Sequence, residues 1–191
     1  MIRKNDAGKS TLLKMVVGAM VPDSGQVRIG AAVKVGYFAQ QALDLLDPDL
    51  TVDEQLQQDF PKDSIGSLRN LAGAFQFSGD DVNKKIRALS GGEKTRLVMA
   101  RMLFDPPNFL VLDEPTNHLD LATKEMLIHA LRDFEGTMLF VSHDRNFLRS
   151  LSNRVIELGG ESGTDVHPHL FPGSYAEYVV RTGHEAPGVH R

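Results

Sequence analysis

Hydrophobic positions change their spacing several times along this chain, and each change predicts a different element. The apolar residues after Lys9 recur at helical spacing, which predicts an amphipathic helix reaching Met20 and stopped by the turn residues 22–25. Residues 26–29 and 33–38 are rich in β-branched and aromatic side chains, so two short strands are predicted there. The chain therefore opens with an α/β pattern.

The middle of the chain changes character. Gln, Asp and Leu dominate residues 42–88, and β-branched residues become rare. Thr51 and Glu54 have the spacing of a capping box at a helix start, and the apolar positions of 68–75 indicate a second helix. Together with the helix expected up to Phe104, this predicts a helical subdomain at about residues 42–104.

The second half returns to strands alternating with helices. Ser90 and Glu93 form another S-x-x-E cap, and the helix after them is followed by the fully apolar run 109–112, as expected of a buried parallel strand. Residues 137–141 and 155–158 are the next predicted strands. This alternation predicts an α/β fold with a mostly parallel sheet.

Composition limits the class of protein. The chain has 191 residues, 41% hydrophobic residues and a net charge of −4, typical of one globular domain without a basic nucleic-acid-binding face. It has no cysteine and no apolar run near the roughly 20 residues needed to cross a bilayer. We expect a soluble, cytoplasmic domain over residues 1–182 and a flexible tail over 183–191.

The first chemical motif is the end of a phosphate loop. Gly8, Lys9 and Ser10 match the last part of G-x-x-x-x-G-K-[ST], in which backbone N–H groups hold phosphate, the lysine reaches the β- and γ-phosphates, and the hydroxyl holds Mg²⁺. Arg3 stands where the first glycine belongs, and only Met1 and Ile2 precede it in place of a strand. An N-terminally truncated start, with weak nucleotide binding by the chain alone, is the expectation.

Two acids follow the apolar run. Asp113 and Glu114 come at the carboxyl end of a predicted parallel strand, where open α/β sheets place ligands. Asp113 is positioned to hold Mg²⁺ through water, and Glu114 to polarise an attacking water as a general base. An acidic loop after a core strand is the alternative, which the following residues 115–120 make harder to sustain.

Leu89-Ser90-Gly91-Gly92-Glu93 is the sharpest single signal. Two glycines at a helix start let a phosphate approach the backbone, and the helix dipole favours its charge. A well-capped helix is the plain alternative, but it explains only Ser90 and Glu93 and not the paired glycines.

Two further polar residues complete the series. His143 follows a predicted strand, 29 residues after Glu114 (143 − 114), and is placed to bond a γ-phosphate and sense its loss. Gln40 is the weakest candidate, because Gln41 beside it is equally suited to be the functional amide, or both are surface residues. The histidines at 167, 169, 184 and 190 are interpreted as solvated rather than metal-binding.

These motifs, in this order, resemble the ATP-binding cassette superfamily over essentially the whole chain. The Glu93 ending of the signature, the stretches 113–120 and 142–148, and Phe171-Pro172-Gly173-Ser174-Tyr175 look like the ABC-F branch, whose members carry two cassettes and no membrane domain. The resemblance implies the C-terminal cassette of such a protein, with a P-loop NTPase fold that includes a small antiparallel β part.

The resemblance also implies roles, residue by residue. ATP and Mg²⁺ are the implied cofactors, and the implied partners are a second cassette, in the same chain or as a homodimer, and the ribosome, with no membrane contact. Translation or antibiotic resistance is the implied setting; the alternative is the ATP-binding subunit that energises a membrane transporter. The implied catalytic residues are Glu114, His143 and Gln40, and the implied metal ligands are Ser10, Gln40 and Asp113. The implied nucleotide-binding residues are Asn5, Ala7, Gly8, Lys9, Ser10, Thr11, Ser90, Gly91, Gly92 and Asp120.

Overall fold

The structure is a computed structural model, and it describes residues 8–117, 119–158 and 168–186. The chain divides into two compact units. The sheet unit is drawn from residues 1–37, 108–116 and 135–191, and the helical unit from 38–107 and 117–134. The helical unit thus takes in, beyond the predicted stretch 42–104, the helix α5 (Leu121–Arg132).

The sheet unit is built on three strands in the order β1 (Val35–Phe38), β2 (Phe109–Asp113) and β3 (Thr137–Val141). β2 and β3 are parallel, and their register pairs Asp113 with Val141, so the loops after both strands leave the same edge of the sheet. Helix α1 (Lys9–Val16) contacts β2 and buries Leu13 against Val111 and Val141. The fully apolar run thus forms the predicted parallel strand.

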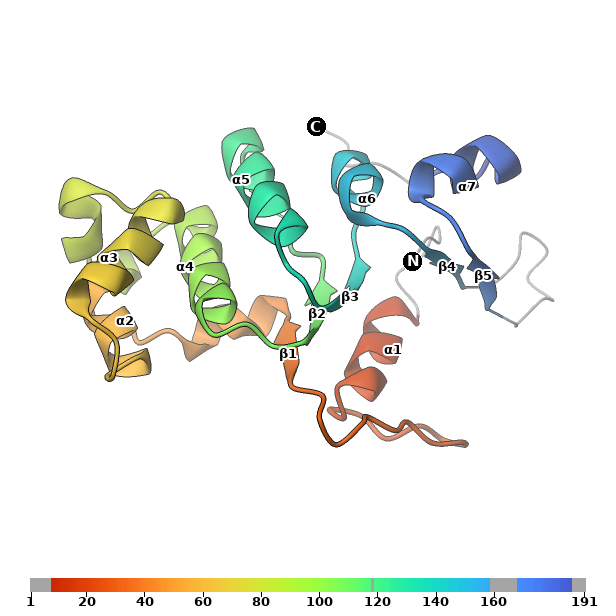
Figure 1. The fold of residues 1–191 in the computed structure, drawn as a ribbon, viewed down its shortest axis with the longest axis horizontal. Helices are drawn as coiled ribbons and strands as arrows, with labels where there is room; N and C mark the ends of the chain where they lie inside the picture. Colours follow the sequence, from red (N-terminus) through yellow and green to blue (C-terminus); the bar gives the residue numbers. More distant parts are fainter. Residues whose placement is uncertain (1–7, 118, 159–167, 187–191) are drawn as a thin grey trace. The chain divides into compact units, whose positions relative to one another are not determined.

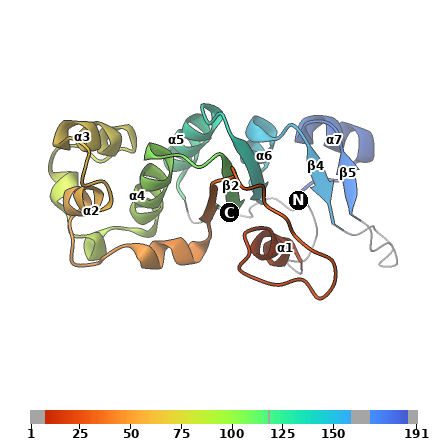
Figure 2. The same cartoon turned by 60° about the horizontal axis from the view of Figure 1, so that its bottom comes forward.

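The remainder of the sheet unit packs around a second apolar cluster. Its elements are α6 (Arg145–Leu151), β4 (Val155–Glu157), β5 (His169–Phe171) and α7 (Tyr175–Thr182). β4 and β5 pair antiparallel as a small separate sheet next to α7 (Figure 2). Phe171, Tyr175 and Tyr178 bury their rings in this cluster, with Tyr178 edge-on to Phe171.

The helical unit consists of α2 (Val52–Asp59), α3 (Ile65–Ala74), α4 (Gly91–Phe104), α5 and three short 3₁₀ turns, η1 (Gln40–Leu45), η2 (Gly79–Asn83) and η3 (Ile86–Ala88). α2 packs on α3 and α4, and α4 packs on α5 (Figure 1). The Arg101 guanidinium of α4 bonds Asp59 at the end of α2. These contacts join helices far apart in the sequence into one unit.

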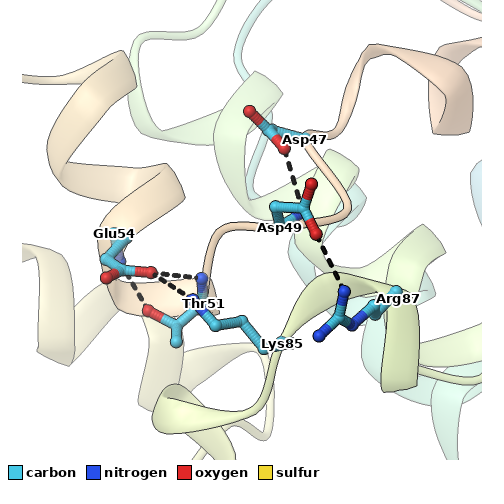
Figure 3. Close-up of polar contacts among 6 residues, drawn as sticks. All are labelled: Asp47, Asp49, Thr51, Glu54, Lys85 and Arg87. Carbon is cyan, nitrogen blue, oxygen red and sulfur yellow. Dashed lines mark hydrogen bonds and ion pairs between the residues drawn. The ribbon is translucent and has the colours of Figure 1, made fainter.

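The start of α2 shows the predicted capping box in full (Figure 3). Glu54 N donates to Thr51 Oγ1, and Thr51 N donates to Glu54 Oε2, which Lys85 also approaches to 3.3 Å. Arg87, two residues after Lys85, donates to Asp49 Oδ1. The backbone N–H groups of Thr51 and Glu54 therefore both have hydrogen-bond acceptors, which stabilises the start of the helix at this point.

Two expected elements differ from the sequence prediction. Helix α1 ends at Val16 rather than near Met20, because Gly18 adopts a left-handed conformation with φ of 76° and the chain turns there. No strand forms at residues 26–29, where Val27 and Ile29 are 43% and 42% exposed. A strand needs a hydrogen-bonded neighbour, and the described residues supply none for this segment.

The segment predicted as a flexible tail is described for residues 183–186. Ala186 is 1% exposed, and its backbone N donates to Tyr175 Oη at 2.7 Å. Glu185 pairs with Arg145 at 2.6 Å. These four residues are therefore packed against the sheet unit, because their polar and apolar groups both find partners there; residues 187–191 lie outside the described part of the chain.

Candidate functional site

The phosphate-loop residues lie at the amino end of α1. Gly8 caps this helix in the left-handed conformation, with φ of 106° and no side-chain hydrogen bond to the first turn. The first N–H groups of a helix have no partner within the helix and carry the positive end of its dipole, so this end favours an anion. Thr11 lies in the same first turn. Asn5 and Ala7 lie outside the described residues.

Lys9 is buried, with 2% of its surface exposed, and its Nζ lies 3.4 Å from His143 Nε2. An ammonium has only donors, so a hydrogen bond here requires Nε2 to be unprotonated and the ring proton to sit on Nδ1. The amino end of a helix and an adjacent ammonium both favour an anion, so this place is suited to receive a phosphate next to Lys9 and His143.

Ser10 and Asp113 are brought together across 103 residues of sequence. Ser10 Oγ donates to Asp113 Oδ1 at 3.0 Å, with Asp113 at the carboxyl end of β2. Among the described residues no group of three or more His, Cys, Asp or Glu is arranged to hold a metal. A hydroxyl and one carboxylate nevertheless fit Mg²⁺, which takes few protein oxygens and completes its shell with phosphate and water.

Glu114 has an unusual backbone and an unusual carboxyl group. Its φ is 50°, a conformation that costs a non-glycine residue about 1–3 kcal/mol and that clusters at functional sites, although Gln76 adopts a similar φ after α3. Burial raises the pKa of Glu114 above the usual 4.5, although the charges of His143 and Lys9 and the His143 N–H act in the opposite direction. A raised pKa suits a carboxylate that must accept a proton from water.

The two oxygens of Glu114 have different surroundings. Oε2 accepts the backbone N–H of His143 at 3.2 Å. Oε1 is buried and accepts no hydrogen bond from the described residues, although His143 Nε2 is 3.2 Å away. One ring nitrogen cannot accept a hydrogen bond from Lys9 and donate one to Glu114 at the same time, so this short distance is not counted as a hydrogen bond. Oε1 is thus a buried oxygen to which none of the described residues donates a hydrogen bond.

Three supporting residues were not identified from the sequence. Ser142 is 1% exposed and its Oγ lies 3.0 Å from Thr116 Oγ1, which ties the loop of His143 to that of Glu114. Tyr37 on β1 has a buried hydroxyl, and burial and then the charge of Asp113 raise its pKa. Ser142 and Thr116 flank the motifs in sequence, but a hydroxyl has no pattern that distinguishes a supporting role.

The predicted Ser90–Gly92 segment belongs to the helical unit. Ser90 caps α4 by accepting from Glu93 N, and Glu93 Oε2 accepts from Ser90 N, so the capping box is complete. Neither glycine has positive φ; a Cβ on Gly91 would meet nothing within 4 Å, and one on Gly92 would make an ordinary contact of 3.9 Å with Leu119. Nothing inside the helical unit therefore requires glycine at these two positions.

Asp120 is also in the helical unit and caps α5. Its Oδ1 accepts from Thr123 N at 2.8 Å, and these hydrogen bonds lower its pKa. Arg96 of α4 donates to Thr123 Oγ1 at 3.1 Å, linking the two capped helices. Gln40 begins η1, and its side chain is outside the described part, so its assignment to metal and catalysis stays a prediction.

The geometry thus joins the phosphate-loop end, the two acids and the histidine in one place within the sheet unit. A family profile described as ABC transporter matches residues 2–117, more than half of the chain. The chain belongs to this family. Relatives of this cassette are ATP-binding proteins of the ABC-F type.

Two curated relatives show the degree of likeness. The cassette is 44% identical to "Putative ATP-binding protein YdiF" of Bacillus subtilis over 95% of this chain and 27% of that protein. It is also 44% identical to "ABC transporter F family member 5" of Arabidopsis thaliana, over 81% of this chain and 22% of that protein. The chain thus spans about a quarter of the length of these relatives.

Two solved structures share the fold. One is a dimeric ATP-binding cassette in a post-hydrolysis state with ADP and Pi, with a TM-score of 0.61, 25% identity, and coverage of 78% of this chain and 75% of that chain. The other is an archaeal ribosome recycling factor in complex with a ribosomal stalk protein, with a TM-score of 0.66, 26% identity, and coverage of 91% and 34%. Within the described residues, no helix combines the length and apolar character of a membrane span.

Proposed function

We propose that this cassette binds ATP with Mg²⁺ and hydrolyses the terminal phosphoryl bond. The observation that carries the proposal is that His143 lies within hydrogen-bonding distance of both Lys9 and Glu114. The phosphates would lie at the amino end of α1, next to the buried Lys9. ADP and Pi in the related dimeric cassette support the choice of nucleotide.

Each residue has a stated task in this proposal. Lys9 neutralises the β- and γ-phosphates, and Ser10 and Asp113 would hold Mg²⁺, which supplies positive charge to the transferred phosphoryl group. The Glu114 carboxylate orients a water for attack and takes its proton, and His143 contacts the γ-phosphate. Positioning and charge, rather than covalent chemistry, supply the rate enhancement.

A second cassette completes the site. Ser90, Gly91 and Gly92 would contact the nucleotide held by the partner cassette, which explains paired glycines that the helical unit itself does not require. The dimeric state of the related ADP-bound cassette supports this arrangement. The partner is a second cassette of the same protein or a second copy.

The cellular role belongs to the same proposal. The ABC-F relatives, together with the recycling factor held by a ribosomal stalk protein, favour a cytoplasmic ATPase that acts on the ribosome, in translation or in resistance to ribosome-targeting antibiotics. The competing role is an ATP-binding subunit that energises a membrane transporter, as the general family description allows. The two roles predict different partners for the ATP-bound state.

Co-sedimentation separates the two roles. The complete protein that carries this cassette, with Glu114→Gln to retain ATP, should pellet with purified ribosomes in ATP and be released in ADP. Lys9→Ala in the same protein should not pellet in either nucleotide, because it removes the direct phosphate contact. Absence of ribosome binding by an ATP-loaded Glu114→Gln protein would contradict the translation role, and ATP-dependent binding to transporter-containing vesicles would support the competing one.

A further inference from the structure

Residues 183–186, which we call the strap, fold back on the sheet unit directly after α7. Gly183 ends α7 in the left-handed conformation with φ of 73°, which reverses the chain. His184 then lies 3.0 Å from Glu157 Oε1 and 3.3 Å from Tyr178 Oη. Ala186 is buried in the cluster around Tyr175. The strap is therefore anchored at both of its ends.

Two arginines of α6 contact the strap: Arg149 lies 3.9 Å from Glu185 Oε1, and Arg145 makes the closer contacts. Arg145 Nε donates to the backbone oxygen of Ala186 at 3.1 Å, and its NH1 lies 2.6 Å from Glu185 Oε2. An exposed ion pair alone contributes little. Here, however, one planar guanidinium holds the carbonyl and the carboxylate of consecutive residues, a fork geometry that lysine cannot reproduce.

Arg145 is the first residue of α6 and stands two positions after His143. Asp144, between them, caps α6 by accepting from Asn146 N and Phe147 N, and its own N–H donates to Ser142 Oγ. His143 is thus held on one side by the buried Ser142 and on the other by the first turn of α6. A shift of that turn moves the imidazole relative to Lys9 and Glu114.

We propose that Arg145 is a positioning residue for His143, and that the strap sets its position. The effect on catalysis rests on the proposed function, in which His143 and Glu114 act on ATP. Because Lys9 and Ser10 are held by α1 rather than α6, loss of the Arg145 fork should impair turnover and leave nucleotide affinity intact. The strap thus helps to hold His143 where it contacts the γ-phosphate.

The test is Arg145→Lys in the complete protein, with two readouts. Backbone amide hydrogen exchange at residues 143–147 should become about tenfold faster, while exchange in β2 stays unchanged. The kcat for ATP hydrolysis should fall about tenfold with KM for ATP within about twofold, because small misplacements of a catalytic group mainly affect turnover. Arg154→Lys, an exposed arginine before β4, is the matched control and should change neither readout.

Glu185→Gln closes a double-mutant cycle. Combined with Arg145→Lys it should slow turnover no more than the stronger single change, because both act on one junction. Unchanged exchange at 143–147, or faster exchange with an unchanged kcat, would overturn the inference. Failure of the proposed function gives a different result: in the same assay Glu114→Gln would hydrolyse ATP as fast as the unmodified protein, whatever the exchange data show.

Discussion

Glu114 has both a strained backbone and a carboxyl group whose charged form is disfavoured by burial. It combines a left-handed backbone, a largely buried carboxyl group and one oxygen without a hydrogen bond from the described residues. Structural positions are rarely so unfavourable, since each feature lowers the free energy of unfolding. The combination is expected where a water and a phosphate are to complete the surroundings.

The raised pKa of Glu114 predicts a pH-dependent stability difference. Because its folded-state pKa lies above 4.5, the stability from this group is complete below that pH and is lost as pH rises through the raised value. Glu114→Gln removes this loss, so its melting temperature should exceed that of the unmodified protein at about pH 7.5, and the gain should vanish near pH 4. Thermal melts of both proteins at several pH values measure this; an equal gain at every pH would contradict a burial effect on ionisation.

Lys9 gives a prediction about affinity rather than stability. Lys9→Ala removes a charged phosphate contact, and such contacts are worth about 1.5–3 kcal/mol, so ATP affinity should fall about tenfold to a hundredfold. Lys14→Ala, one turn or so along the same helix, is the matched control and should bind ATP normally. Isothermal titration calorimetry with Mg-ATP measures the affinity of both variants. Unchanged affinity in Lys9→Ala would show that Lys9 does not contact the phosphates.

Among the helices and strands, those that depend on residues close together in the sequence are predictable, and those that depend on pairing with a distant segment are not. The capping boxes at Thr51 and Ser90 predicted the starts of α2 and α4 because the interacting residues are three apart. The apolar run of β2 was equally clear. The strand expected at 26–29 failed because pairing depends on a neighbour that local spacing does not reveal.

The same distinction holds for the site. Each residue of the proposed catalytic site lies in a recognisable short motif: Lys9, Ser10, Asp113, Glu114 and His143. The resemblance to the cassette family implies that these motifs form one nucleotide site. The fork between Arg145 and the strap was not foreseen, because it joins residues 41 positions apart that have no shared motif. These contacts fall within the stretch for which the sequence predicts a flexible tail.

The amino end of α4 supports a prediction about assembly. Ser90→Arg should leave ATP binding by the cassette itself intact and prevent ATP-driven pairing of cassettes, because the larger side chain occupies the approach to Gly91 and Gly92. Ser64→Arg controls for the loss of a serine cap, worth about 1 kcal/mol, since the Ser64 side chain accepts from Ser67 N at the start of α3 just as Ser90 accepts from Glu93 N, although α3 lacks the reciprocal half of the capping box. Size-exclusion chromatography in ATP measures pairing, and undisturbed dimers of Ser90→Arg would count against the shared site.

At the scale of the whole molecule, the sheet unit and the helical unit carry different halves of the proposed chemistry. The sheet unit holds Lys9, Ser10, Asp113, Glu114 and His143, and the helical unit holds Ser90, Gly91, Gly92 and Asp120. In the proposed assembly, the helical unit of one cassette serves the nucleotide of the other. Hydrolysis is then a property of the paired protein, which is the form to assay.

In the proposed function, Glu114 activates the water that attacks ATP. The most direct measurement is steady-state phosphate release by the complete protein, compared with its Glu114→Gln variant under saturating Mg-ATP. The variant should bind ATP but release phosphate at least about a hundredfold more slowly, since a positioned general base contributes about 10²–10⁴-fold. Phosphate release at the unmodified rate by the Glu114→Gln protein would show that Glu114 is not the general base.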